Sequence, residues 1–320
     1  MRRYTRRVFI RDMAIGGLGM AGTSAFVSRV RADTAKRRFT MDLACGRIGV
    51  RANLQEAIRL AHANGFESVE PPANQLAKLS ATELHDLRAE MANKNLVWGA
   101  AGLPVDFRKD DERFRAGLAA LPPIAQGLQR AGVTRVGTWI SPNHDSRTYI
   151  ANFKQHASRL REVAKILGDF GQRFGLEYVG PKTLWTASRH AFIHSMAETK
   201  ELIAEIRQSN VGFVLDSWHW YTAHETGEDL LTLTNEDVVA CDLNDAPAGV
   251  PVDEQVDNRR ELPAATGVID LKSFLKALVE IGYDGPVRAE PFNRDLNAMD
   301  NEPATAATAV AMKKAFALVN

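Results

Sequence analysis

Short apolar and β-branched runs alternate with longer amphipathic segments from residue 39 to the end of the chain. Runs of about four to eight such residues predict buried strands, and a 3.6-residue apolar period predicts helices. The amphipathic segments include residues 54–64, 81–94, 153–174, 196–208 and 271–281. The predicted strands are residues 39–45, 68–70, 97–101, 133–140, 176–179, 211–215, 238–243 and 287–290.

Glycines mark the predicted ends of several helices, since Gly65, Gly132, Gly175 and Gly282 each follow the last apolar turn. Eight strands, each followed by a helix or a loop able to hold one, predict an α/β protein with a single (β/α)8 TIM barrel. The alternative is a doubly wound sheet. It is disfavoured because the segment 45–49 (CGRIG) lacks the third glycine of a phosphate loop and leads into no clear helix. No linker or internal repeat interrupts the chain after residue 38, so residues 33–320 are predicted to form one domain.

The first 32 residues follow a different pattern, which is typical of an export signal. Arg6 and Arg7 lie in a run (TRRVFIR) that resembles the twin-arginine motif, and a weakly apolar stretch rich in Gly and Ala follows. The segment 30–32 (VRA) has the small-x-small form of a cleavage site. We expect residues 1–32 to be a signal peptide for the twin-arginine export machinery and the mature protein to be periplasmic or secreted. An exposed basic helix is the alternative.

Composition excludes several classes of protein. The 320 residues carry 40 Lys and Arg against 39 Asp and Glu; without residues 1–32 these become 33 and 38, a net charge of −5. Such an acidic chain is poorly suited to nucleic acid. Two cysteines, Cys45 and Cys241, make no disulfide framework or zinc ribbon and are expected to be buried free thiols. No apolar run approaches the ~18 residues of a membrane span, so none is expected after cleavage.

Acidic residues lie at or near the ends of four consecutive predicted strands: Glu177, Asp216, Asp242 and Glu290. The chemistry of such barrels lies at the carboxyl ends of the strands, where these side chains would meet. Four buried carboxylates repel one another unless they are protonated or a cation neutralises them. Oxygen ligands favour Mg²⁺ or Mn²⁺ over zinc, with Co²⁺ a further option. Helix caps and loop ion pairs are the alternative role for these residues.

The segment 210–219, with Asp216 and His219, resembles the D-x-x-H segment of the xylose isomerase-like sugar isomerase/epimerase barrels. This family includes the ketose 3-epimerases and inosose dehydratases and, more distantly, endonuclease IV. Residues 260–270 and 281–290 resemble its last two strands, and the similarity extends over residues 39–318. The resemblance implies a sugar-converting barrel that often forms homo-dimers or tetramers.

The resemblance also implies the metal ligands Glu177, Asp216, Glu290 and a residue of the seventh strand. The family usually has His there, whereas this chain has Asp242, three residues before Asp245. A four-carboxylate site would prefer Mn²⁺ or Mg²⁺. Alternatively Asp242 is too short to reach, and the site is three-liganded or inactive.

Further residues are expected around the substrate. The resemblance implies that His219 touches a substrate oxygen and that Arg260 binds a hydroxyl or carboxylate. Glu70 closes the second strand, where it contacts substrate or forms a structural ion pair. Lys182 either adds positive charge near the metal or is a solvated loop residue. Aromatic residues near strand ends would stack on a sugar or belong to the core: Trp98, Trp139, Trp185, Trp218, Trp220 and Tyr221.

These features predict a divalent-metal-dependent sugar isomerase or epimerase that acts on a ketose or keto-sugar through an ene-diolate. Glu177 and Glu290 would ligate the metal and transfer the proton. A dehydratase or lyase acting on a keto-inositol or 3-keto-glycoside would use the same intermediate. A non-catalytic exported sugar-binding protein is a further alternative. An endonuclease IV-like phosphodiesterase is disfavoured, because only eight histidines occur and the mature chain is acidic.

Overall fold

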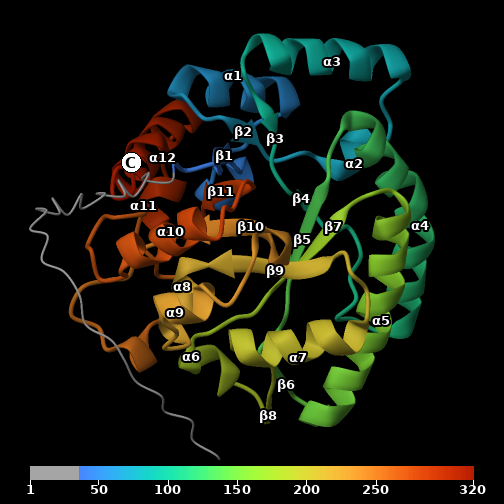
Figure 1. Ribbon diagram of the computed structural model, residues 1–320, viewed down its shortest axis with the longest axis vertical. Coiled ribbons are helices and arrows are strands. Elements are labelled where there is room, and N and C mark those ends of the chain that lie inside the picture. Colours follow the sequence, from blue (N-terminus) through green and yellow to red (C-terminus); the bar gives the residue numbers. More distant parts are fainter. Residues whose placement is uncertain (1–35) are drawn as a thin grey trace, which may run out of the picture. The chain divides into compact units, whose positions relative to one another are not determined.

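A closed barrel of parallel strands is the centre of the molecule in the computed structural model, which describes residues 36–320 (Figure 1). The predicted signal peptide lies outside the described residues. Nine strands pair in the order β3-β2-β1-β11-β10-β9-β7-β5-β4. Only two residues separate β3 from β4, so they are two pieces of one strand and the sheet closes with eight strand positions. The strands are β1 (Thr40–Leu43), β2 (Ser68–Val69), β3 (Val97–Trp98), β4 (Ala101–Gly102), β5 (Arg135–Trp139), β7 (Arg173–Glu177), β9 (Val211–Asp216), β10 (Val238–Leu243) and β11 (Pro286–Ala289).

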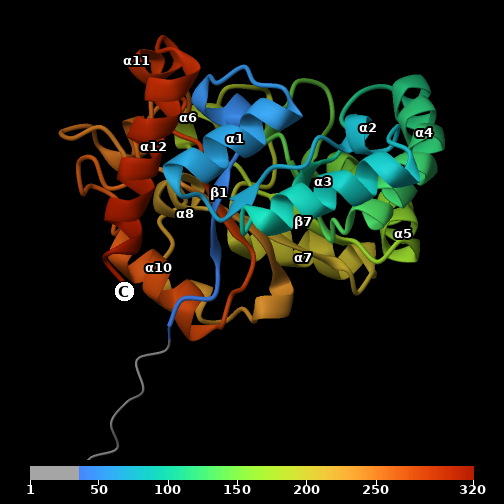
Figure 2. The same cartoon turned by 90° about the horizontal axis from the view of Figure 1, so that it is seen from above.

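Helices surround this barrel, with α10 and α12 on the side opposite α4 and α5 (Figures 1 and 2). A small antiparallel pair, β6 (Asn143–His144) with β8 (His190–Ala191), lies apart from the main sheet. None of the helices in the described part of the chain combines the length and apolarity that a membrane span requires. The helices are α1 (Leu54–Asn64), α2 (Ala73–Leu76), α3 (Ala81–Asn93), α4 (Asp111–Ala131), α5 (Tyr149–Asp169), α6 (Lys182–Trp185), α7 (Met196–Ile206), α8 (Ser217–Thr222), α9 (Gly227–Leu230), α10 (Leu271–Glu280), α11 (Arg294–Asn297) and α12 (Asn301–Phe316), with 3₁₀ turns η1 (Cys45–Ile48), η2 (Asn235–Asp237) and η3 (Val252–Glu254).

The predicted single (β/α)8 barrel is confirmed, with one error at the end of a helix. Gly65, Gly132 and Gly282 follow α1, α4 and α10 with φ of 76°, 85° and 71°, a left-handed backbone that glycine adopts without strain. Gly175, in contrast, lies inside β7. The chain leaves α5 earlier, at Gly171 with φ of 73°, and β7 therefore begins three residues before the predicted strand.

Two apolar layers hold the barrel. The larger lies between the strands and the surrounding helices, and a small separate cluster of Ala100, Val214 and Ala240 lies apart from it. Val214 and Ala240 each precede an acidic residue by two positions, so they share the face of their strand with Asp216 and Asp242. A Cβ built on Gly175 would approach Val214 Cγ2 to 2.8 Å, so little space remains there. This tight apolar layer adjoins the layer of acidic side chains.

The strand register sets charged residues side by side. Asp42 of β1 aligns with Arg288 of β11, Arg288 with Asp242 of β10, and Asp242 with Asp216 of β9. Residues aligned across parallel strands point to the same face of the sheet. One row of side chains therefore contains three carboxylates and one guanidinium group.

Candidate active site

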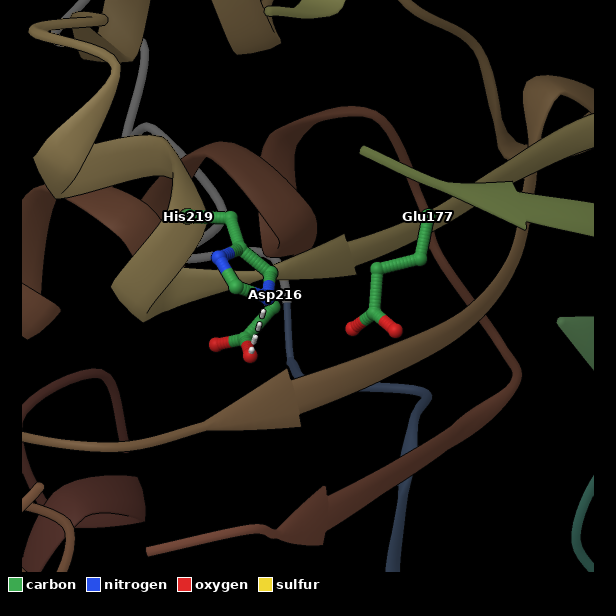
Figure 3. Close-up of side chains that lie close together, drawn as sticks. All are labelled: Glu177, Asp216 and His219. Atoms are coloured by element: carbon green, nitrogen blue, oxygen red, sulfur yellow. Dashed lines mark ion pairs between the residues drawn. The ribbon is translucent and has the colours of Figure 1, made fainter. Parts of the chain in front are cut away.

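Four carboxylates and a histidine meet at the carboxyl ends of the strands. Glu177 ends β7, Asp216 ends β9, Asp242 lies one residue before the end of β10, and Glu290 follows β11; each is 7% exposed or less. One oxygen each of Glu177, Asp242 and Glu290 lies within 4.8 Å of the others, and so do ligand atoms of Glu177, Asp216 and His219. Figure 3 shows the second of these groups. The structure therefore brings together the residues that the sequence placed in one cluster.

Arg288 forms a bidentate ion pair with Asp242. Its Nε donates to Oδ1 at 2.6 Å and its Nη2 to Oδ2 at 2.8 Å, and both side chains are almost fully buried. Arg47, from the turn η1, reaches the same place: its Nη1 lies 3.5 Å from Asp242 Oδ2 and forms an ion pair with Glu290 Oε1. Parallel hydrogen bonds between guanidinium and carboxylate are among the strongest in proteins, so Asp242 is firmly held.

Arg260 joins two further carboxylates. Its Nη1 donates to Asp216 Oδ2 at 2.7 Å and to Glu290 Oε2 at 3.2 Å. The other oxygen of Asp216 accepts from the backbone N–H of Trp218 and from the side chain of Asn244, each at 2.8 Å. Arg260 was expected to bind substrate, whereas its Nη1 donates to carboxylates of the site.

The two glutamates have different surroundings. Burial, followed by repulsion from Glu290, raises the pKa of Glu177 well above its ordinary value. Its Oε1 is buried and has no hydrogen-bond partner among the described residues. Burial also raises the pKa of Glu290, but Arg47 and Arg260 oppose that effect. Glu177 therefore keeps its proton more readily, and Glu290 ionises first.

The pKa values of the two aspartates of the site are shifted in opposite directions. Burial raises the pKa of Asp216 to about 6, although Arg260 favours its charged form. Burial alone would raise the pKa of Asp242 too, but Arg288 and Arg47 outweigh burial and lower it. Asp242 is therefore a charged member of an ion pair.

His219, on α8, is neutral. Burial, helped by the positive charge of Arg260, lowers its pKa to about 4. Its Nδ1 accepts a hydrogen bond from the backbone N–H of Gly180 at 3.2 Å, so in the neutral ring Nε2 carries the proton. Nε2 lies 3.7 Å from Asp216 Oδ2, along the dashed line of Figure 3. The histidine thus presents an N–H donor to the cluster.

The cluster has the composition of a metal site, but most of its oxygens are already bonded. Both oxygens of Asp242 and both of Glu290 accept from arginines, and both of Asp216 accept from N–H groups. A divalent cation such as Mn²⁺ or Mg²⁺ takes about six oxygen ligands, some of them water, and here it would lie against three guanidinium groups. The four-carboxylate metal site expected from the sequence therefore does not fit this arrangement. That expectation did not include Arg47 and Arg288, which lie among the carboxylates.

The two remaining predicted residues lie outside the cluster. Glu70 follows β2 and lines a cavity of about 680 Å³ together with Cys45, Gly46 and Leu103. Gly46 precedes Arg47 in the chain, and this volume lies within the usual range for small-molecule sites. Lys182 forms an ion pair with Asp253 at 2.7 Å, and its side chain is 47% exposed. Lys182 is therefore solvated, as in the second of the two predictions, but it begins the helix α6 and does not lie in a loop.

Trp139 lies at the rim of the site. It is aligned with Glu177 across β5 and β7, so both point to the same face, and it is 45% exposed. Arg108 lies over the ring, 4.3 Å from its centre. Trp218 and Trp220 are buried and belong to the core. Of these three tryptophans, Trp139 is the one positioned to contact a ligand.

Asp245, two residues after the end of β10, shapes a loop. Its Oδ2 accepts from the backbone N–H groups of Thr266 and Gly267 at 2.9 and 2.7 Å, and its Oδ1 accepts from Ile269 at 3.0 Å. These bonds hold the turn after Arg260. Asp245 therefore has a structural role beside the site.

Two residues of the site, Arg47 and Arg288, were not predicted from the sequence. Arg288 did leave a signal, because it is a charged residue inside an apolar strand and lies two positions before Glu290 on the same face. Arg47 left none, since its partner Glu290 is 243 residues away in the chain.

Known proteins resemble this chain in both sequence and fold. The inosose isomerase of Bacillus velezensis is 27% identical over 246 residues, covering 75% of this chain and 84% of that protein. The match to the Bacillus subtilis inosose isomerase spans about half of each protein, 47% and 51%. A shorter match, 28% identical, is to a 3-dehydroshikimate dehydratase of Pseudomonas aeruginosa and covers 44% of this chain and 21% of that one.

Solved structures agree with the fold. A xylose isomerase domain protein from Alicyclobacillus acidocaldarius is 32% identical, covers 85% of this chain and 96% of that one, and has a TM-score of 0.74. The IOLI protein with a bound zinc atom is 20% identical with a TM-score of 0.72 and covers 88% and 99%. The family described as xylose isomerase-like TIM barrel matches residues 58–315. The chain therefore belongs to the xylose isomerase-like TIM barrel family.

Proposed function

We propose that this protein is a sugar isomerase or epimerase that transfers a proton at the carbon next to the carbonyl of a ketose or cyclic keto-sugar. The observation that carries this proposal is the pairing of Glu177 with Glu290. An oxygen of each carboxyl group lies within 4.8 Å of one of the other; Glu177 has an oxygen with no hydrogen-bond partner in the described part of the chain, and Glu290 lies between two arginines. Neighbouring groups with opposed protonation preferences are the requirement for paired acid and base catalysis.

The protonation states assign the roles. Glu290, ionised, takes the proton as the C–H bond breaks, and the electron pair moves to the carbonyl oxygen to give an ene-diolate. Glu177, protonated, returns its own proton to the other face of the same carbon, which inverts that carbon. Return of the proton to the former carbonyl carbon, with the hydroxyl proton passing from one oxygen of the ene-diolate to the other, gives isomerisation instead.

Donors near the carboxylates stabilise the negative oxygen. Arg47 is the arginine that substrate can reach, because its side chain is 25% exposed against 1% for Arg260 and 2% for Arg288. The Nε2–H of His219 adds a neutral donor. Positive and N–H groups fixed in advance where charge develops lower the barrier of such a step. The expected Mn²⁺ or Mg²⁺ is not part of this scheme, because arginines already hold the oxygens it would use.

The match to inosose isomerases supports a cyclic keto-sugar as substrate. The match to a dehydratase favours a second candidate, elimination of a β-hydroxyl from the same ene-diolate. Elimination needs one further proton, delivered to the leaving oxygen, for which Glu177 is again placed. We also propose, from the pattern of residues 1–32, that the protein acts after twin-arginine export, in the periplasm or outside the cell.

Proton NMR in D₂O tests the proposed function. A panel of ketoses, keto-inositols and 3-keto-glycosides is incubated with the protein, and deuterium at the carbon next to the carbonyl is measured. We expect at least one substrate to exchange, and Glu290→Gln, which removes the base that takes the proton, to slow that exchange by at least ~100-fold, the usual contribution of a general acid or base. A new alkene signal would identify the lyase.

Glu162→Gln is the matched control, since Glu162 pairs with Arg115 on the surface and its side chain is 38% exposed. This variant should keep the wild-type rate. Exchange that survives in Glu290→Gln would contradict the assigned role of Glu290. Absence of exchange and of elimination across the panel would contradict the proposed function itself.

A further inference from the structure

The carboxyl groups of the site face three arginines. Arg288, Arg47 and Arg260 carry three positive charges into a group of four carboxyl groups. Each of these guanidinium groups donates to at least one of the carboxylates, and Arg260 also donates to Asp257 at 2.7 Å. The oxygens of Asp242 and Glu290 that a divalent cation would use therefore already accept hydrogen bonds from arginines.

The Arg288–Asp242 pair is part of the barrel framework. The two residues are aligned across β10 and β11, and their side chains are 2% and 0% exposed. The planar guanidinium group donates to both oxygens of Asp242, so a cation would have to displace a buried bidentate ion pair to reach them. The zinc-containing relative shows that this fold can hold a metal ion, and here an arginine occupies the oxygens of one acidic residue of the cluster.

We infer that the three arginines replace the divalent cation in this protein and that its site works without a metal. Arg288 neutralises Asp242, and Arg260 neutralises Asp216 and orients Glu290. Arg47, the most exposed of the three, faces the substrate and provides the positive charge for its developing oxygen anion. The last role rests on the proposed function, whereas the lack of metal binding does not.

Calorimetric titration tests metal binding without any substrate. The full chain is dialysed against EDTA and titrated separately with MnCl₂, MgCl₂ and ZnCl₂. We expect no stoichiometric binding to the wild type. The variant Asp242→His with Arg288→Ser removes the ion pair and adds an imidazole ligand, so it should bind Zn²⁺ at least ~100-fold more tightly than the wild type. Arg115→Ser, which removes a surface arginine, should titrate like the wild type.

Wild-type binding of one Mn²⁺, Mg²⁺ or Zn²⁺ per chain would overturn the inference, whatever the double variant does. If circular dichroism shows that the double variant is unfolded, the wild-type titration decides alone.

Exchange in D₂O, measured on any substrate the panel identifies, gives the second test. EDTA should leave the wild-type rate unchanged, and Arg47→Gln should lower it at least ~100-fold with no change in the metal titration. Loss of exchange on chelation, with recovery on adding metal, would overturn the inference. A panel without any exchange would contradict the proposed function, while the titration would still decide whether the site binds metal.

Discussion

Replacing Asp42 by Asn should stabilise the protein at alkaline pH and change it little at acidic pH. Asp42 lies on β1, is 1% exposed, and neither of its oxygens has a hydrogen-bond partner among residues 36–320. A Cβ built on Gly99 would lie 2.4 Å from Oδ1, so the carboxyl group is packed against backbone. Burial raises its pKa from 3.8 to about 7, even though Arg288 favours the charged form.

The sign and size of the effect on stability follow from the difference between the pKa of Asp42 in the folded and in the unfolded protein. A carboxyl group whose pKa is raised by folding is more easily protonated in the folded state. Its favourable contribution is complete below pH 3.8 and is lost as the pH rises through 7. A difference of about three pKa units corresponds to about 4 kcal/mol, of which about 3 kcal/mol falls between pH 5 and pH 8. Asn has the shape of the neutral acid and does not ionise, so the variant lacks this loss.

Urea unfolding of wild type and Asp42→Asn, followed by circular dichroism at pH 5 and pH 8, measures the effect. The variant should gain about 3 kcal/mol relative to wild type between the two pH values. Asp86→Asn, at an exposed position of α3, should show no such change. A difference that does not vary with pH, or one that favours wild type at pH 8, would refute the reasoning and mean that Asp42 is charged against Arg288.

Three other changes have defined outcomes. Asp216→Asn removes the charge of one of the three carboxylates that pair with Arg260; deuterium exchange should fall at least ~100-fold while circular dichroism shows a folded barrel, and near-normal exchange would show that Asp216 has no role in the reaction. Gly127→Ala brings a Cβ to 2.4 Å from the backbone of Ala77, so urea unfolding should show that the free energy of unfolding falls by about 1–3 kcal/mol. An unchanged free energy of unfolding would mean that α2 and α4 can move apart without cost. Arg6→Lys with Arg7→Lys should leave the full-length precursor in the cytoplasm, because the export receptor distinguishes paired guanidinium groups from lysines; normal mature protein in the periplasmic fraction would show that residues 1–32 are not such a signal.

The barrel could be predicted because its determinants are local. Each strand is a short apolar run, and three of the four predicted glycine stops end their helices with positive φ. The segment 169–177 was harder, since Phe170, Phe174 and Leu176 extend the apolar pattern of α5 across the turn at Gly171 and into β7. A period of 3.6 and a period of 2 are difficult to separate over so few residues.

The carboxylates of the site were predictable for a related reason, because the ends of parallel strands meet at one edge of the barrel. Their charge balance was not. Arg47 comes from a 3₁₀ turn, and nothing in the segment 45–49 indicates that its side chain reaches residue 290. Contacts between residues so far apart in the chain depend on the register of the closed barrel, which composition and periodicity do not contain.

Asp242 and Arg288 show what this register adds. Taken separately, each is a charged residue inside an apolar run, and a carboxylate without a visible partner invites the prediction of a metal ligand. Because the two residues are aligned across β10 and β11, each neutralises the charge of the other. Removing one partner of such a buried pair leaves an uncompensated charge and typically costs 3–5 kcal/mol, whereas replacing both by apolar residues is often neutral. The two positions therefore have to change together. The carboxylate at 242 and the arginine at 288 form one structural feature, which cannot be recognised when each residue is considered separately.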